Sequence, residues 1–275
     1  IPDLAVMRDR EPPGFRKTLY TILSLGWRGA SRQWKHYRQA YWYFAAFATP
    51  LVVSVHSVVS WDFAMSQNPG WHSTIFGPYY VAGAIFSGFA MVITLLIPLR
   101  KTFKLEDYLT NWHFDAMAKL ILLTSSIVAY TYIVEMFIAW YSGNTYEMHA
   151  FWDRAFGPMA WAFWIMVLGN CLAPQLLWFK KLRVHLPTLF VISILANIGM
   201  WFERFVIICQ SLNANFNPWV WRGNYEPTLV EYGITAGSFA WFFMYFMLFI
   251  RFMPTFSISE LKELLPPPLR RRKAS

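Results

Sequence analysis

Charged side chains are scarce in this 275-residue sequence, at 14 % of positions, where soluble domains usually carry about a quarter. Cysteine is scarcer still: Cys171 and Cys209 form no CxxC motif, so the chain cannot hold an iron–sulfur cluster. Of the six histidines only His56 lies well inside an apolar stretch, which excludes a bis-histidine haem between facing helices. P-loop, HExxH, GxSxG and metal-spaced motifs are absent, so no resident metal is expected.

Hydrophobic residues are what the sequence has in quantity, at 56 % of positions. They gather in six stretches of about 21 to 28 residues, long enough to cross a hydrocarbon core of roughly 30 Å. Because a bilayer offers no water to backbone amides, such stretches must be helices. The six stretches are residues 39–62, 76–99, 114–141, 157–179, 186–209 and 232–252. The sequence therefore predicts an all-α polytopic membrane protein with six transmembrane helices, and Gly83 and Gly88 predict close helix contact.

The basic residues indicate the orientation of these helices. If the stretches alternate in direction, 20 of the 24 lysines and arginines fall on one side and only Arg154 and Arg222 on the other. Cytoplasmic segments carry the excess of Lys and Arg, so both termini of this chain are expected in the cytoplasm. The net charge of +9 is thereby assigned to membrane topology, and no nucleic-acid partner is expected.

The segments outside the apolar stretches also read as membrane-associated. Residues 1–38 are predicted to be a cytoplasmic basic linker with an amphipathic helix from about Gly14 to Arg38, suited to the membrane surface. Residues 253–275 are predicted to be a cytoplasmic basic tail after the last transmembrane helix. The sequence opens at Ile1, and we expect it to begin partway through a longer polypeptide.

The first candidate site lies around the end of the first apolar stretch. His56 and Asp62 are six residues apart on one helix, and His72 follows in the next connection. Six helical residues separate two side chains by about 9 Å and 240°, so His56 and Asp62 need not touch but can face a shared cavity. One reading is a polar pair at a helix end beside an ordinary loop histidine. The other is a set of proton acceptors for quinol oxidation.

The second candidate site follows the third and fifth stretches. Asp115 and Lys119 are four residues apart and can pair on one helix face. The structural reading adds one ion pair between helices, Glu135 with Arg204, because both lie at a similar depth. The alternative is a proton path, since chains of ionisable groups in transmembrane bundles are typical of proton relays. Its members would be Asp115, Lys119, Ser126 and Tyr130, followed by Asn197, Glu203, Arg204 and Glu135.

Five runs of the sequence resemble the NrfD/polysulphide-reductase family of membrane subunits. They are LVVSVHSVVSWDFAMSQNPGWHSTIFGPYYVAGAIFSGFAMV, LRKTFKLEDYLTNWHFDAMAKLIL, VEMFIAWYSGN, PQLLWFKKLR and IGMWFERFVII. Within the family, the sequence is most similar to the ActC-type subunit of bacterial alternative complex III, with the ActF type second. The resemblance extends over nearly the whole chain.

The resemblance implies a fold of two four-helix bundles with no cofactor of its own. Such subunits carry about ten transmembrane helices, so the six here would be the last, and the first four would lie outside this sequence. Residues 39–62 would close the first bundle and contribute Asp62, His56 and His72 to a site for menaquinol or ubiquinol near the periplasmic face. Residues 76–211 would form the complete second bundle, where a proton path is expected.

The resemblance also implies partners and a location. These are a periplasmic iron–sulfur subunit, a homologous NrfD-like membrane subunit, a multihaem cytochrome c subunit, and lipid of the bacterial inner membrane. The chain would be part of an enzyme only within such a quinol:electron-acceptor oxidoreductase, whose haem and iron–sulfur clusters reside in the partners. Two alternatives stay open: a secondary transporter, because Pro50 and Pro174 interrupt apolar stretches, and a structural anchor for peripheral redox subunits.

Overall fold

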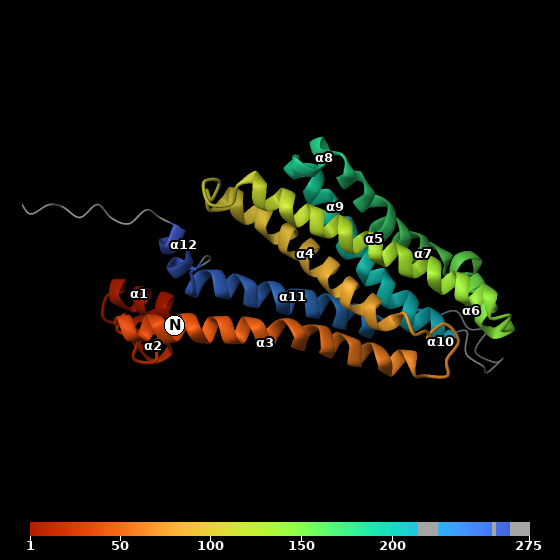
Figure 1. Ribbon diagram of the computed structural model, residues 1–275, viewed down its shortest axis with the longest axis horizontal. Coiled ribbons are helices and arrows are strands. Elements are labelled where there is room, and N and C mark those ends of the chain that lie inside the picture. Colours follow the sequence, from red (N-terminus) through yellow and green to blue (C-terminus); the bar gives the residue numbers. More distant parts are fainter. Residues whose placement is uncertain (214–224, 255–256, 265–275) are drawn as a thin grey trace, which may run out of the picture. The chain divides into compact units, whose positions relative to one another are not determined.

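The computed structural model describes residues 1–213, 225–254 and 257–264, and its regular elements are helices (Figure 1). The chain divides into two compact units. We name residues 48–225 the central unit, and residues 1–47 with 226–275 the terminal unit. Most of the predicted basic tail, and the loop that carries Arg222, lie outside the described residues.

Six helical segments in the described part are long and apolar enough to cross a membrane, which confirms the predicted fold class. Their apolar lengths explain why they form, since a lipid-exposed backbone must satisfy its own hydrogen bonds. They are α3 (Ser31–Ala64), α4 (Phe76–Thr102), α5 (Asn111–Tyr141), α7 continuing into η1 and η2 (Ala160–Trp178), α9 continuing into η3 and α10 (Leu186–Asn213), and α11 (Leu229–Phe252). The protein is therefore a multi-pass membrane protein.

Four of these segments form a helix bundle in the central unit. Helix α4 packs against α5 and α9, α9 packs against α7, and α5 packs against η1 and η2 (Figure 1). Helix α6 (Thr145–Phe156) lies at one end of this bundle, and α8 (Lys180–Val184) lies at the other. We call these the α6 end and the α8 end. The arrangement is the complete four-helix bundle that the sequence predicts.

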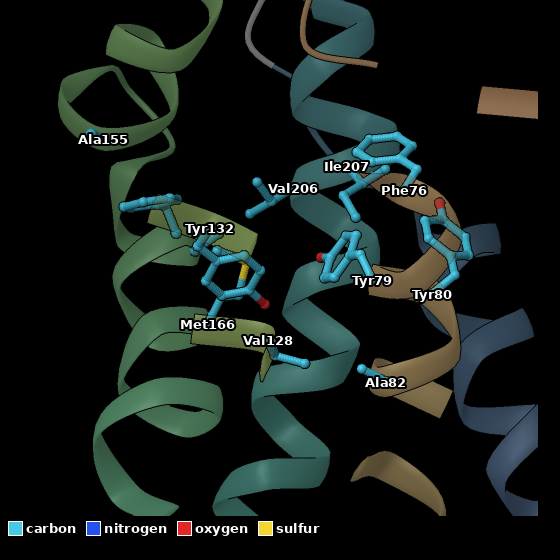
Figure 2. Packing of buried hydrophobic residues seen from close by; sticks show 12 residues of the cluster. Phe76, Tyr79, Tyr80, Ala82, Val128, Tyr132, Ala155, Met166, Val206 and Ile207 are labelled. Carbon is cyan, nitrogen blue, oxygen red and sulfur yellow. The ribbon is translucent and has the colours of Figure 1, made fainter. Parts of the chain in front are cut away.

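An aromatic core fills the bundle towards the α6 end. In Figure 2 the rings of Tyr79 on α4 and Tyr132 on α5 point into the space between the helices, and their centroids are 5.8 Å apart, edge to face. Aromatic pairs in this geometry add about 0.5–1.5 kcal/mol to the burial of their area. The buried cluster comprises Phe76, Tyr79, Tyr80, Ala82, Val128, Tyr132, Ala155, Ala162, Phe163, Met166, Val206 and Ile207.

Two glycines let the fourth and fifth spanning segments approach closely. A Cβ on Gly169 of η1 would lie 2.5 Å from the Leu195 carbonyl oxygen and 2.9 Å from the Gly199 Cα of α9. Backbones in membrane bundles come this close only where side chains are small. In α4, Gly83 also faces α9, where a Cβ would lie 3.3 Å from Met200 Cε, but Gly88 faces open space. The contact predicted at Gly88 is therefore wrong.

The terminal unit departs from the predicted amphipathic helix. Helix α2 (Phe15–Leu23) ends early, and Gly26 and Gly29 take left-handed conformations with φ of 71° and 76° before α3 begins. Glycine adopts such angles without steric cost, so the chain turns where the sequence suggested one helix. Preceding α1 (Pro2–Arg10) packs on α2. Near the other end of the chain, α12 (Ile258–Leu264) is tied to α1 because the Ser259 N–H donates to Asp3 Oδ1 at 2.8 Å.

The glycine contact gives a stability prediction. Gly169→Ala should lower the melting temperature of the purified protein, because an added methyl has no room and overpacking costs about 1–3 kcal/mol. Gly88→Ala is the matched control, since no atom lies within 4 Å of the Cβ it would introduce. Thermal unfolding in detergent, followed by tryptophan fluorescence, measures both. Equal melting temperatures would contradict the role of this contact.

Candidate functional site

Glu203 of α9 is the most deeply buried carboxylate described, with 1 % of its surface exposed. The Tyr132 hydroxyl of α5 donates to Glu203 Oε2 at 2.5 Å, and Asn170 Nδ2 of η1 donates to the same oxygen at 3.0 Å. Asn170 Nδ2 also lies 2.9 Å from the Tyr132 hydroxyl oxygen. We call Glu203, Tyr132 and Asn170 the carboxylate network. Buried polar groups need such partners, and here three spanning segments supply them.

The helix that carries Asn170 is locally unwound into a π-helical turn, η1 (Leu168–Leu172). Single π turns accommodate one extra residue and are frequent at functional sites. In this turn the side chain of Asn170 is fully buried and faces α5 and α9. A second π turn, η3 (Val206–Gln210), follows Glu203 closely on the neighbouring segment. Both departures from regular α-helix therefore flank the carboxylate network.

The ion pair predicted between Glu135 and Arg204 is absent from the ion pairs of the described residues. The Arg204 guanidinium instead lies 4.6 Å from the centre of the Tyr80 ring, as a cation–π contact. Arg204 follows Glu203 in α9 and therefore points about 100° away from it, towards α4 and not α5. Equal depth in two helices was correct, but depth does not determine which faces meet.

Glu135 faces a different cation. It is 8 % exposed, and its Oε1 has no hydrogen-bond partner among the described residues. The charges that act on it are those of Arg154 on α6, then Glu203 and Glu147. Burial lowers the pKa of the Arg154 guanidinium, and the Glu135 carboxylate opposes that shift. Glu135 therefore joins the carboxylate network electrostatically to the α6 end of the bundle.

At the α8 end the predicted pair of Asp115 and Lys119 is confirmed. Lys119 Nζ lies 2.6 Å from Asp115 Oδ2. The structure adds a third member that the sequence analysis missed, because Arg183 Nε of α8 donates to Asp115 Oδ1 at 2.6 Å. The Lys119 side chain is 58 % exposed and that of Arg183 only 13 %, so Arg183 is the better shielded partner.

The remaining members of the predicted path do not follow Asp115 into the bundle interior. Tyr130 is 61 % exposed, and the Ser126 hydroxyl donates to the Leu122 carbonyl of its own helix at 2.8 Å. Asn197 does face another helix, since its Nδ2 donates to Thr94 Oγ1 of α4 at 3.0 Å. Thr94 Oγ1 in turn lies 2.9 Å from Ser193 Oγ. The interior polar line in this half thus runs through uncharged side chains of α4 and α9.

His56, Asp62 and His72 lie apart from the carboxylate network. His56 is half-buried and its Nδ1 lies 2.7 Å from the Val52 carbonyl oxygen of α3, whereas the Asp62 side chain is exposed. His72 is exposed, with Nδ1 3.3 Å from the Ser66 carbonyl oxygen. No hydrogen bond or ion pair of the described residues joins any two of these three. Their partners, if a site forms here, must come from outside the described chain.

An apolar cavity of about 530 Å³ lies between the end of α5 and α6. Its walls are Met136, Ala139, Trp140, Thr145, Met148, His149, Phe151, Trp152, Ala155 and Phe156. Only Thr145 and His149 offer polar side-chain atoms, so the cavity has room for hydrocarbon but is chemically unlike the carboxylate network. Among the described residues, no group of three or more His, Cys, Asp or Glu is placed to hold a metal ion.

These features define the class of protein: a multi-pass helix bundle with a buried carboxylate network and a separate ionisable pair on α3. The chain belongs to the polysulphide reductase, NrfD family, whose family model matches residues 16–215. It is similar to a protein of Halobacterium salinarum named "Putative dimethyl sulfoxide reductase membrane subunit", at 26 % identity over 278 aligned positions. That match covers 91 % of this chain and 60 % of the relative, so the chain spans about three-fifths of the relative's length.

The carboxylate network predicts unequal effects for two identical substitutions on α5. Tyr132→Phe removes a hydrogen bond to a buried carboxylate and should destabilise the protein by about 1–3 kcal/mol. Tyr130→Phe makes the same chemical change two residues away, on an exposed side chain, and should leave the melting temperature unchanged. Thermal unfolding of the two purified variants measures the difference. Similar losses in both would show that the Tyr132 hydroxyl contributes nothing to stability.

Proposed function

We propose that this chain is the C-terminal six-helix part of the membrane subunit of a quinol-oxidising redox complex. Its family membership supports this function, as does its similarity to a protein named as a reductase membrane subunit. The sequence resemblance favours the ActC type of alternative complex III. In this proposal the protein lies in the bacterial inner membrane, the α6 end is periplasmic, and both termini of the chain are cytoplasmic.

The observation that carries the proposal is the division of α3 into two faces at the α6 end. Phe63 packs against Trp71 and Tyr80, with ring centroids 5.0 and 5.7 Å apart. Asp62, one residue earlier, is exposed. An ionisable group at membrane depth is costly and by default marks a functional site. The uncovered face of α3 therefore suits a quinol site completed by further helices of a longer subunit.

The two histidines have the tautomer that proton acceptance requires. A carbonyl oxygen can only accept a hydrogen bond, so His56 Nδ1, facing the Val52 oxygen, carries the proton. The neutral ring then presents Nε2 as an acceptor. His72 Nδ1 faces the Ser66 oxygen, and the same reasoning applies to it.

Quinol oxidation releases two protons and two electrons for each quinol that becomes quinone. In the proposed mechanism the Asp62 carboxylate accepts one hydroxyl proton and a histidine Nε2 accepts the other. Both electrons leave to an iron–sulfur cluster in a periplasmic partner subunit. A multihaem cytochrome c subunit and a homologous NrfD-like subunit are the further proposed partners.

A proton path through the second bundle belongs to the same proposal, along a line that differs from the predicted one. Asp115 at the α8 end and the uncharged line of Thr94, Ser193 and Asn197 would serve its lower half. Glu203 and Glu135 would serve its upper half. Lys119, Ser126 and Tyr130 bond within α5 or are exposed, so they are poorly placed to continue it.

Replacing the carboxylate of Asp62 tests the quinol site. Asp62→Asn keeps the side-chain size but cannot accept the proton, so quinol:acceptor turnover of the intact complex should fall by roughly 10²-fold or more. Asp107→Asn, an exposed aspartate in the connection at the α8 end, is the matched control and should keep wild-type turnover. Wild-type turnover by Asp62→Asn would remove Asp62 from the mechanism. Failed assembly with normal turnover per assembled complex would favour the structural anchor.

The orientation is tested by cysteine labelling in whole cells. In a background without Cys171 and Cys209, a cysteine at Asn68 should react with a membrane-impermeant maleimide added from the periplasm. A cysteine at Lys104 should react only after the membrane is permeabilised, because cytoplasmic connections carry the basic excess. The reverse pattern would overturn the proposed orientation. Asn217, on the same predicted side as Asn68, lies outside the described residues.

A further inference from the structure

The connection 65–75 between α3 and α4 is fastened to the bundle at two adjacent residues, Gly70 and Trp71. It follows Asp62 by only a few residues and contains His72. We call Arg154, Glu147, Gly70 and Trp71 the loop clamp. The sequence marks none of these four as a site residue, and it singles out only Arg154, as a loop cation.

Arg154 makes the first attachment. It is 4 % exposed, and its Nη2 donates to the Gly70 carbonyl oxygen at 2.9 Å and to Ser211 Oγ at 2.6 Å. The Gly70 N–H donates to Glu147 Oε2 at 2.8 Å. Both backbone polar groups of Gly70 are therefore held by charged side chains of α6. Hydrogen bonds to charged groups are about twice as strong as neutral ones.

The backbone at Gly70 is shaped for this contact. Its φ of +81° lies in the left-handed region that favours glycine. A Cβ at this position would also collide with Arg154 Nη2. The close approach of the guanidinium and the glycine conformation thus depend on each other.

Trp71 makes the second attachment. Its indole Nε1 donates to the Ile207 carbonyl oxygen at 2.5 Å. Ile207 lies in the π turn η3, where an i→i+5 pattern changes which carbonyls the helix itself uses. The Trp71 ring also contacts Phe63 of α3, one residue after Asp62. The clamp therefore extends from the second bundle to the last turn of α3.

A buried arginine is a costly way to fasten a loop. Removing a guanidinium from water costs several kcal/mol unless its attachments compensate, and Arg154 Nε still has no partner among the described residues. An apolar side chain would stabilise α6 with less desolvation. What a charged group adds is a defined position for the backbone it holds, and the residue held lies two positions before His72.

We propose that Arg154, together with Glu147, is a positioning residue for the quinol site, acting through Gly70 to hold His72 and the end of α3 in place. This inference rests on the proposed function. It assigns the second bundle a direct part in quinol binding, in addition to any proton path.

The experiment uses the intact complex in a background without Cys171 and Cys209. A spin label on Gln67→Cys, an exposed residue of the same connection, reports loop mobility independently of quinol chemistry. Arg154→Gln should increase the mobility of the label and raise the KM for quinol about tenfold, roughly the factor for one charge-assisted hydrogen bond. The fall in kcat should be smaller, as expected when a binding interaction is lost.

Two further variants separate positioning from folding. Both hydrogen bonds of Arg154 come from Nη2, so Arg154→Lys can restore them in part and should lower the KM towards wild type. Glu147→Gln keeps a side chain of the same size and should show a weaker version of the same effects if Arg154→Gln fails to assemble. Lys101→Gln, which removes an exposed charge at the α8 end, is the control and should change neither readout.

The outcomes are distinct. An unchanged label spectrum in Arg154→Gln and Glu147→Gln would overturn the clamp. A mobile loop with an unchanged KM would overturn the positioning role. If the label becomes mobile while Asp62→Asn retains wild-type turnover, the proposed catalytic role of Asp62 fails and the clamp stands.

Discussion

The burial of one carboxylate, Glu203, constrains the central unit more than any other interaction. A carboxylate in a low-dielectric interior needs hydrogen-bond donors, and its donors here come from Tyr132 on α5 and Asn170 on η1. Meeting that need fixes how three spanning segments are rotated about their axes. The close approach at Gly169 and Gly199 then brings the donors within reach. Packing and polar satisfaction are thus solved by the same neighbouring residues.

The fold was predictable because membrane helices are set by apolar length, which residue order states directly. The break before α3 was missed because it depends on left-handed backbone at Gly26 and Gly29, which hydropathy does not report. The pair of Asp115 and Lys119 was predictable because four-residue spacing is local. The pair of Glu135 and Arg204 was wrong because depth along two helices says nothing about their rotation, and Arg204 faces Tyr80.

The interior polar residues that sequence reasoning missed are mostly uncharged: Tyr132, Asn170, Thr94 and Ser193. Such residues are common on lipid-facing and interfacial surfaces too, so type alone does not identify them. Asn170 did carry a signal, as a lone amide within an apolar stretch. Its partners could not be inferred, because the π turn at η1 changes the helical spacing from which facing residues are counted. The loop clamp was hidden for another reason, since Gly70 takes part through its backbone.

The two π turns have a consequence for how this protein can vary by inheritance. A π turn holds one residue more than the α-helical turn it replaces, so it is where a helix has absorbed a one-codon insertion. Elsewhere in a spanning helix such an insertion would rotate everything beyond it by about 100°. Within Leu168–Leu172 and Val206–Gln210 the excess is taken up locally. Related chains can therefore differ by single-residue gaps at these turns while the helix faces on either side keep their register.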